Sequence, residues 1–204
     1  ALSSAASDVY KRQQYKGAIM KNILILSSSP RKNGNSDILC EQFIKGAKES
    51  GHNTEKIYIS DMKINYCTGC GVCNTTGECV QKDGMEKIYE KMLKADVIVF
   101  ATPVHFYSMC GQMKVFIDRL VPIYTKLVNK EVYIIVTAWD PEKANLTSTV
   151  EAIRGLTRNC MEGTIEKGVI LGSGSAEKGE VEKTPTYLEA CLLYTSPSPR
   201  DGLL

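Results

Sequence analysis

Short apolar runs that alternate with amphipathic segments constrain the fold of this chain most strongly. Five runs predict strands, at 22–29, 53–60, 96–103, 131–139 and 164–172. Helical spacing of apolar residues predicts helices at 35–51, 85–95, 108–124 and 146–161, and the opening of a last helix at 180–190. Asn35 or Ser36 is the expected N-cap of the first helix. Strands that alternate with helices predict a parallel sheet with helices on both faces.

The number of strands narrows the winding of this α/β fold. Five strands suit the flavodoxin-like three-layer sandwich, whose parallel sheet has the order 2-1-3-4-5. In that winding a ligand lies beyond the carboxyl ends of strands 1 and 3, where the strand order reverses. The loops at 27–36 and 102–108 follow these two strands, so we expect them to converge.

Composition excludes several classes of protein. The chain has 204 residues, 43% hydrophobic and 24% charged, which is typical of one globular domain. Its formal charge is only +2 and its basic residues are dispersed, which speaks against nucleic-acid binding. Its longest apolar runs are shorter than the roughly 20 residues that cross a bilayer, so we expect no membrane partner.

Both ends of the chain look foreign to this domain. Ser3–Gln13 and Cys191–Asp201 resemble translations of the two adapters used in transposase-based DNA-library preparation. We therefore expect residues 1–19 and 191–204 to be non-native flanks, Met20 to be the start, and the domain to occupy 20–190, with its natural C-terminus missing. The part between the flanks is close to neutral and begins without a secretory segment, which predicts a cytoplasmic protein with reduced thiols.

The loop "SSSPRKNGNS", residues 27–36, combines hydroxyls, an arginine and a helix start, which suits a dianionic phosphate. It has neither a Walker lysine nor G-x-G-x-x-G, so a dinucleotide-binding Rossmann unit is not expected here. A plain strand-to-helix turn is the alternative, because Ser, Asn and Gly favour turns for conformational reasons alone.

Two motifs together carry a family resemblance. "SSSPRKNGNSDIL" and "ADVIVFATPVHFYSMCGQMKVFIDR" resemble the phosphate loop and the second flavin loop of the NAD(P)H-dependent FMN reductase-like branch of the flavodoxin superfamily. The resemblance covers most of 20–190 and implies FMN as cofactor. It assigns the phosphate to the first loop and the isoalloxazine ring to the second, and the loop after strand 4 is a third candidate. The expected FMN-binding residues are Ser29, Pro30, Arg31, Gly34, Asn35, Ser36, Pro103, Val104, His105, Phe106, Ala138 and Trp139.

Some of these positions admit two interpretations. His105 stands where the family usually has an aromatic residue, and it either tunes the flavin or fills the aromatic slot. Trp139 either stacks on the flavin or caps the sheet edge. No catalytic residue is assigned, because hydride transfer to flavin needs no protein base. Lys114, Asp118 and Arg119 also match the family pattern, and an intrahelical ion pair or a subunit contact explains them.

Four cysteines lie in a segment at 60–84 that is an insertion in the predicted fold. Cys67, Cys70, Cys73 and Cys79 have the spacing C-x2-C-x2-C-x5-C, and a tight run of this kind can hold a 4Fe-4S cluster. The pattern resembles the cysteine motif of the iron-sulfur flavoproteins, a subgroup of the same family, in which the motif lies near the flavin. The alternatives are a zinc ion, a redox pair formed by Cys67 and Cys70, or no metal at all. The helical residues Cys40, Cys110 and Cys160 are expected in the core.

The resemblance implies an FMN-dependent oxidoreductase that forms a homodimer or homotetramer. Electrons would pass between NAD(P)H or a ferredoxin-like donor and an acceptor, with the cluster as relay. A cluster-free NAD(P)H:FMN or quinone reductase is one alternative, and a flavodoxin-like electron carrier without enzymatic activity is another. A redox-sensing DNA-binding protein has no supporting element in this sequence.

Overall fold

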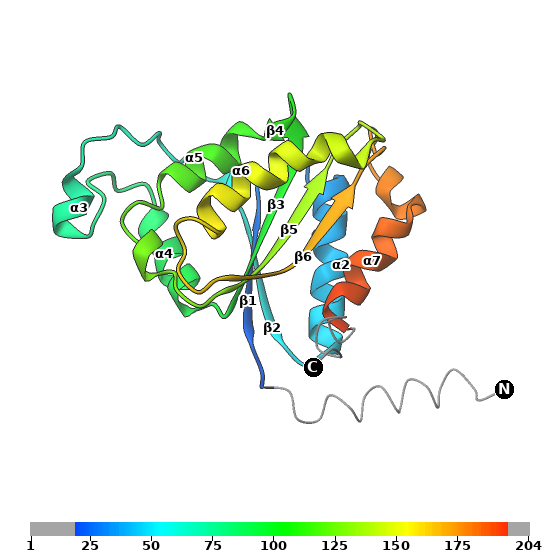
Figure 1. Ribbon diagram of the computed structural model, residues 1–204, viewed down its shortest axis with the longest axis horizontal. Coiled ribbons are helices and arrows are strands. Elements are labelled where there is room, and N and C mark those ends of the chain that lie inside the picture. Colours follow the sequence, from blue (N-terminus) through cyan, green and yellow to red (C-terminus); the bar gives the residue numbers. More distant parts are fainter. Residues whose placement is uncertain (1–18, 196–204) are drawn as a thin grey trace.

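A computed structural model describes residues 19–195 and shows an α/β sandwich around one parallel sheet (Figure 1). The parallel strands are β1 (Asn22–Ser27), β2 (Asn53–Tyr58), β3 (Val97–His105), β5 (Glu131–Thr137) and β6 (Ile165–Gly172). Their order is β2-β1-β3-β5-β6, which confirms the expected 2-1-3-4-5 winding. A short sixth strand, β4 (Ser108–Met109), pairs antiparallel with the end of β3.

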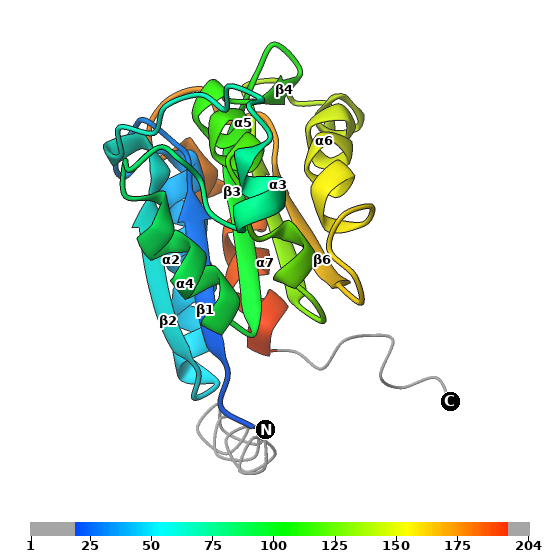
Figure 2. The ribbon, with the colours of Figure 1, turned by 90° about the vertical axis from the view of Figure 1, so that its left-hand side faces the viewer.

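Helices cover both faces of the sheet (Figure 2). The helices are α2 (Asn35–Glu49), α3 (Val72–Thr76), α4 (Met85–Lys94), α5 (Gly111–Asp118), α6 (Thr147–Thr157) and α7 (Pro185–Thr195). Single 3₁₀ turns lie at Ile59–Asp61, Tyr124–Lys126, Lys143–Leu146 and Glu180–Lys183. One apolar core joins the sheet to α4, α5 and α6, and a second joins it to α2 and α7. None of the helices within residues 19–195 has the length and apolar character that a membrane span requires.

Burial on both faces of the sheet explains why the middle of β1, residues 23–26, is wholly apolar. Leu24 and Leu26 belong to the core on the α4–α6 side, whereas Ile23 and Ile25 belong to the core on the α2 side. All four are at most 2% exposed. A strand buried on both faces has no position for a polar side chain until it ends, which is where the predicted loop begins.

The helix expected at 108–124 is much shorter than predicted. Ser108 and Met109 form β4 instead, so α5 begins at Gly111. The helix ends at Asp118, where Arg119 turns its side chain inward toward Asp83. The expected single helix is therefore a hairpin, a two-turn helix and a 3₁₀ turn.

The N-cap of α2 was also predicted wrongly. Gly34 is the N-cap, and neither Asn35 nor Ser36 caps the helix with its side chain. The last helix, α7, starts at Pro185, within the predicted range 180–190, and extends beyond that range to Thr195. That residues 191–204 and 1–19 are non-native flanks stays a prediction, and residues 1–18 and 196–204 lie outside the described part of the chain.

Candidate functional site

Four loops, those after β1, β3, β5 and β6, form one groove at the carboxyl edge of the sheet, which we call the edge groove. It has a volume of about 390 Å³ and lies where the strand order reverses between β1 and β3. Its lining residues are Ser29, Pro30, Arg31, Gly34, Asn35, Ser36, Pro103, Val104, His105, Thr137, Ala138, Trp139, Ser175 and Ala176. The structure thus brings together eleven of the twelve residues expected to bind FMN, all except Phe106. Their contact with FMN stays a prediction.

Backbone contacts shape the loop after β1 into a tight turn. The Gly34 N–H donates to the Arg31 carbonyl at 3.0 Å, and the Ser29 hydroxyl accepts from the Arg31 N–H at 3.3 Å. A Cβ atom on Gly34 would lie 2.9 Å from the Arg31 carbonyl oxygen, so a side chain there would displace the turn. Asn33 adopts the left-handed region with φ of 54°, which Asn tolerates better than most residues. The absence of a side chain at Gly34 therefore lets the backbone of Arg31, in the same loop, lie close to it.

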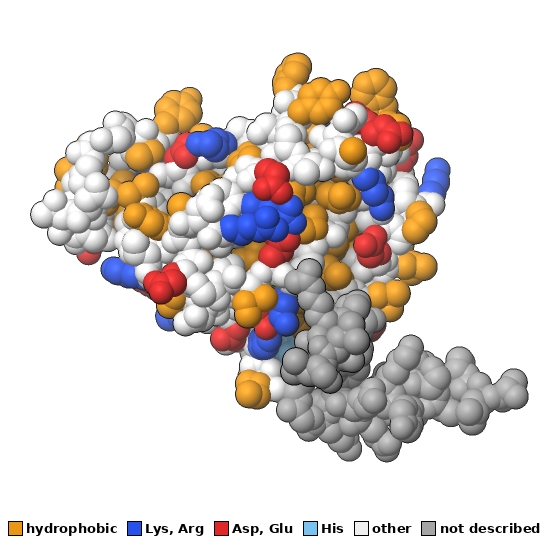
Figure 3. Space-filling view, viewed as in Figure 1, with side chains coloured by type: hydrophobic (Ala, Val, Ile, Leu, Met, Phe, Trp, Pro, Cys, Tyr) orange, Lys and Arg blue, Asp and Glu red, His pale blue; other side chains and the backbone are white. Residues whose placement is uncertain are grey.

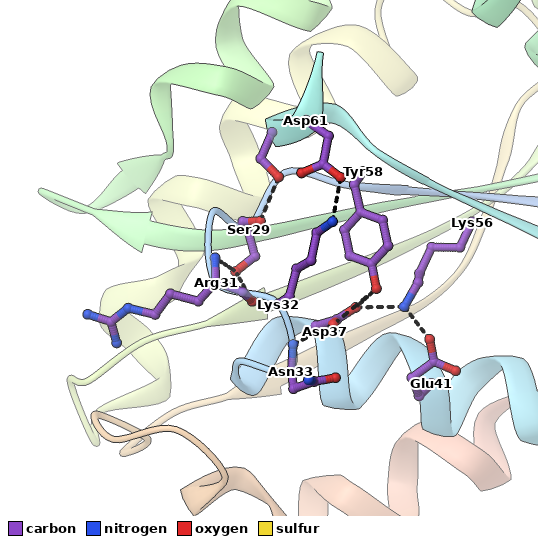
Figure 4. Close-up of polar contacts among 10 residues, drawn as sticks. Ser29, Arg31, Lys32, Asn33, Asp37, Glu41, Lys56, Tyr58 and Asp61 are labelled. Atoms are coloured by element: carbon purple, nitrogen blue, oxygen red, sulfur yellow. Dashed lines mark hydrogen bonds and ion pairs between the residues drawn. The ribbon is translucent and has the colours of Figure 1, made fainter.

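A buried carboxylate supports this loop from below (Figure 4). The Asp37 side chain is 2% exposed and accepts hydrogen bonds from the Asn33 N–H at 2.7 Å, the Lys56 ammonium at 2.6 Å and the Tyr58 hydroxyl at 3.0 Å. Lys56 also pairs with Glu41. Burial alone would raise the pKa of Asp37, but the hydrogen bonds from Lys56 and Asn33 hold that pKa below its ordinary value. The sequence analysis missed this network, although a charged residue in the middle of strand β2 was a signal for it.

Arg31 and Lys32 are neighbours with different surroundings. The Lys32 ammonium pairs with Asp61 at 2.7 Å. Among the described residues, the Arg31 side chain has no ion-pair partner, and in Figure 4 it points away from the Asp37 network. Arg31 also lines the edge groove beside the N-terminus of the 15-residue helix α2. A free guanidinium next to a helix N-terminus is an arrangement that binds phosphate.

The side chains of Asn35 and Ser36 form hydrogen bonds to other groups of the protein. The Asn35 amide donates to the carbonyls of Ser175 and Glu177 and accepts from the Gly179 N–H. The Ser36 and Thr137 hydroxyls share a hydrogen bond at 2.5 Å. Asn35 therefore fixes the loop after β6, which supplies the groove residues Ser175 and Ala176 that the sequence analysis did not anticipate.

A tight hairpin between β3 and β4 carries two exposed aromatic residues. His105 pairs with Ser108, so Phe106 and Tyr107 form a two-residue turn with φ of 49° and 59°. Phe106 is fully exposed at 102% and lines a neighbouring hollow of about 530 Å³ rather than the edge groove. Trp139 is 80% exposed and lines both hollows. Figure 3 shows hydrophobic side chains gathered along the rim where these loops lie.

The cysteine segment, residues 60–84, forms an arm that extends from the sandwich beside α5 (Figure 1). Cys67, Cys70, Cys73 and Cys79 line one hollow of about 120 Å³ in this cysteine arm. Gly69 and Gly71 turn the chain between the thiols with φ of 67° and 74°, a conformation that side chains disfavour. The hollow and the edge groove have no lining residue in common.

The donor set of this hollow suits an iron-sulfur cluster. Four soft thiols line one hollow. A hydrogen bond from the Val72 backbone N–H lowers the pKa of the Cys70 thiol, which favours the thiolate, the form that binds metal. Within residues 19–195, no group of three or more His, Cys, Asp or Glu is arranged to hold one metal ion.

Other predicted residues have mixed outcomes. Lys114 and Asp118 form the expected intrahelical ion pair at 2.6 Å. Arg119 does not join it, because its guanidinium binds Asp83 at 2.6 Å. Cys40 and Cys110 are buried as predicted, but Cys160 is exposed because α6 ends at Thr157 and Cys160 falls in the following turn.

Several known proteins are similar to this chain in sequence. Residues 21–157 match the model of the NADPH-dependent FMN reductase family. An iron-sulfur flavoprotein of Archaeoglobus fulgidus is 45% identical over 103 residues, which cover 50% of this chain and 46% of that protein. An iron-sulfur flavoprotein of Clostridioides difficile is 28% identical over 77% of this chain and 68% of that protein. The chain thus spans about half the length of the first of these relatives.

Solved structures share the fold. An NAD(P)H:quinone oxidoreductase from Methanothermobacter marburgensis superposes with a TM-score of 0.67 at 16% identity, covering 87% of this chain and 96% of that one. At this level of identity the likeness concerns the arrangement of the sheet and helices alone.

Proposed function

The chain belongs to the NADPH-dependent FMN reductase family, and from this premise we propose that it binds FMN in the edge groove and acts as an FMN-dependent oxidoreductase. The observation that carries the proposal is the convergence of eleven expected residues, from three loops, on one groove at the carboxyl edge of β1 and β3. Bound FMN would supply two-electron acceptance and one-electron release.

Different residues of the groove would bind the phosphate and the ring of FMN. Arg31 and the N-terminus of α2 would hold the phosphate, because Arg31 is the exposed arginine of the loop and has no partner among the described residues. Pro103, Val104 and His105 would support the ring from the end of β3. Trp139 would cover the ring from the other side with its exposed indole.

We further propose that the cysteine arm holds a 4Fe-4S cluster that relays single electrons. The four thiols around one hollow support this proposal, as do the names of the relatives. NAD(P)H or a ferredoxin-like protein is the proposed electron donor, and a homodimer or homotetramer is the proposed assembly. A cluster-free reductase remains the second candidate, because the edge groove does not depend on the arm for any lining residue.

FMN binding can be measured through Trp139, because it is the only tryptophan of the chain and lines the groove. The full chain, prepared without flavin, is titrated with FMN while tryptophan emission is recorded. We expect saturable quenching. The Trp139→Phe variant is the matched control: it should lose the signal and still retain FMN after gel filtration. A chain that neither quenches nor retains FMN would contradict the assignment of the groove.

Electron transfer is tested on the same preparation. Anaerobic addition of NADH or NADPH should bleach the flavin absorbance if the protein is a reductase. Bleaching by neither nucleotide, with rapid reduction by a reduced ferredoxin, would instead favour an electron carrier. Iron and sulfide analysis of chain reconstituted under anaerobic conditions separates the cluster-bearing protein from the cluster-free reductase.

A further inference from the structure

Arg119 is an arginine buried at the base of the cysteine arm. It follows the last residue of α5, and its side chain is 1% exposed. Its guanidinium binds the Asp83 carboxylate through two hydrogen bonds, one from Nη1 at 2.6 Å and one from Nη2 at 3.1 Å. Asp83 is itself 7% exposed and lies at the end of the arm. This is a bidentate ion pair shielded from water.

The same guanidinium reaches two further points of the arm. Nη1 donates to the Asn65 carbonyl at 2.8 Å, near the start of the arm, and Nη2 donates to the Cys79 sulfur at 3.5 Å. The Asn65 N–H also donates to Asp83 at 2.9 Å. Both ends of the arm are therefore closed onto one side chain that belongs to the sandwich. No other residue of the described chain makes side-chain hydrogen bonds to both ends of the arm and to one of its four thiols.

Burial of this charge needs an explanation beyond packing. A buried ion pair contributes little net stability compared with apolar residues of the same volume. The Arg119 Nε is buried and has no hydrogen-bond partner among the described residues. The four Nη hydrogens are taken up by the Asp83 carboxylate, the Asn65 carbonyl and the Cys79 sulfur, so Nε–H is the donor left over. One carboxylate already balances the charge, but the guanidinium also donates to a thiol sulfur, which accepts strongly only when it is anionic. Four thiolates that hold an iron-sulfur cluster supply such an acceptor.

We propose that Arg119 is the positioning residue of the cysteine pocket and sets the redox behaviour of the cluster held there. The guanidinium holds the arm closed, and its hydrogen bond and positive charge stabilise the sulfur of Cys79. Uptake of one electron adds one negative charge to the cluster, and a fixed positive charge beside a ligand sulfur favours that reduced form. The proposal rests on the proposed cluster and adds a residue to it that the cysteine motif does not contain.

The test compares variants on the two sides of the ion pair. Arg119→Lys keeps a positive charge for Asp83 but loses the fork that reaches Cys79, and Asp83→Asn keeps the donor to Cys79 but removes a negative charge. The full chain is reconstituted anaerobically with ferrous iron and sulfide. Bound iron and sulfide, the midpoint potential in a dye-mediated titration and the rate of iron release to a chelator are then measured. Arg158→Gln is the matched control, since it removes a half-exposed arginine that pairs with Glu166 and does not line the cysteine pocket.

We expect both variants to release iron about tenfold faster or more, because substituting an outer-shell partner of a metal ligand commonly weakens metal binding by about that factor or more. The midpoint potential separates positioning from a merely structural role: Arg119→Lys should lower it, and Asp83→Asn should raise it. Arg158→Gln should leave both quantities unchanged. If Arg119→Lys fails to fold by circular dichroism, the raised potential of Asp83→Asn carries the test.

Two results would overturn the inference, and they are distinguishable. If wild type binds iron and sulfide but the potentials of the Arg119→Lys and Asp83→Asn variants match that of wild type or shift in the same direction, Arg119 does not tune the cluster and the proposed function stands. If wild type takes up neither iron nor sulfide, the cluster itself is absent and both proposals fail.

Discussion

The edge groove and the cysteine pocket are built in different ways. The walls of the groove follow strands whose register pairs Ser27 with Ala101 and Pro103 with Thr137, so the backbone ladder of the sheet fixes their positions. The cysteine arm contains no strand, and most of its residues from 60 to 84 are exposed or partly exposed, although the Asp83 side chain is shielded. It is attached to the sandwich by the polar contacts of Arg119 and by packing of Met62 and Ile64 at its start against the core. The groove is therefore expected to exist without its ligand, whereas the pocket is expected to depend on its metal.

The largest predicted effect is a loss of iron binding in the cysteine pocket that leaves FMN binding in the edge groove nearly unchanged. Cys73→Ser should abolish iron binding, because a cluster held by four thiolates loses one of its ligands. Backbone amides of residues 64–82 should then exchange faster with solvent, and FMN affinity should change less than about twofold since the sheet is untouched. Hydrogen exchange with mass spectrometry and the Trp139 titration measure the two effects. A parallel loss of FMN binding would show that the arm shapes the groove after all.

The second prediction concerns the support beneath the groove. Asp37→Ala leaves the Lys56 ammonium, which is 10% exposed, without its buried carboxylate, so the free energy of unfolding should fall by about 3–5 kcal/mol. Urea denaturation measures the change. Asp61→Ala is the matched control, because the Lys32–Asp61 pair is half-exposed at 62% and 50%, and its loss should change the free energy of unfolding much less. Equal effects of the two substitutions would contradict the buried role of Asp37.

The pH dependence of stability sharpens this prediction. The pKa of Asp37 is lower in the folded chain than its ordinary value of 3.8, so its stabilising contribution is complete above 3.8 and is lost as the pH falls toward the folded pKa. Asp37→Asn should therefore have a flatter acid limb than wild type in urea titrations between about pH 4 and pH 2. An unchanged limb would assign the acid sensitivity to other carboxylates.

The third prediction tests the ligand side of the groove with neighbouring residues. Arg31→Ala should weaken FMN binding about 10–100-fold, since hydrogen bonds to a charged group contribute about 1.5–3 kcal/mol. Lys32→Ala is the control, because Lys32 is occupied by Asp61 and does not line the groove, and it should change affinity less than about twofold. If Lys32 mattered as much as Arg31, phosphate would be bound by the net charge of the loop and not at a defined site.

The two regions also differ in how far the sequence could predict them. Apolar runs predicted the strands, and their number and alternation with helices predicted the flavodoxin-like order. That topology then predicted where the groove lies, because parallel strands place their carboxyl ends at one edge. The cysteine spacing predicted the pocket. What supports each site was missed: Asp37 and Lys56 lie 19 positions apart, and Asp83 and Arg119 lie 36 apart. Charged residues are ordinarily exposed, and nothing local in the sequence shows which pairs are buried together.

The smallest predicted effect is on stability and concerns the turn between β3 and β4, whose conformation the parallel sheet does not determine. Phe106 and Tyr107 were predicted only as part of a loop at 102–108, and the hairpin was missed because turns with two positive φ angles are usually marked by Asn and Gly. Phe106→Asn with Tyr107→Gly should therefore raise the free energy of unfolding by about 1–2 kcal/mol. FMN affinity should change less than about twofold, since neither residue lines the edge groove.

Thermal and urea denaturation of the double variant measure this gain, with Phe106→Ala as the control that removes an aromatic ring without relieving the turn. Both rings are exposed, so folding gains little from them, while the backbone of the turn disfavours them. A double variant less stable than wild type would instead show that the two rings stabilise the hairpin. A stabilised variant that binds FMN normally but reduces acceptors more slowly would place the aromatic turn in acceptor binding.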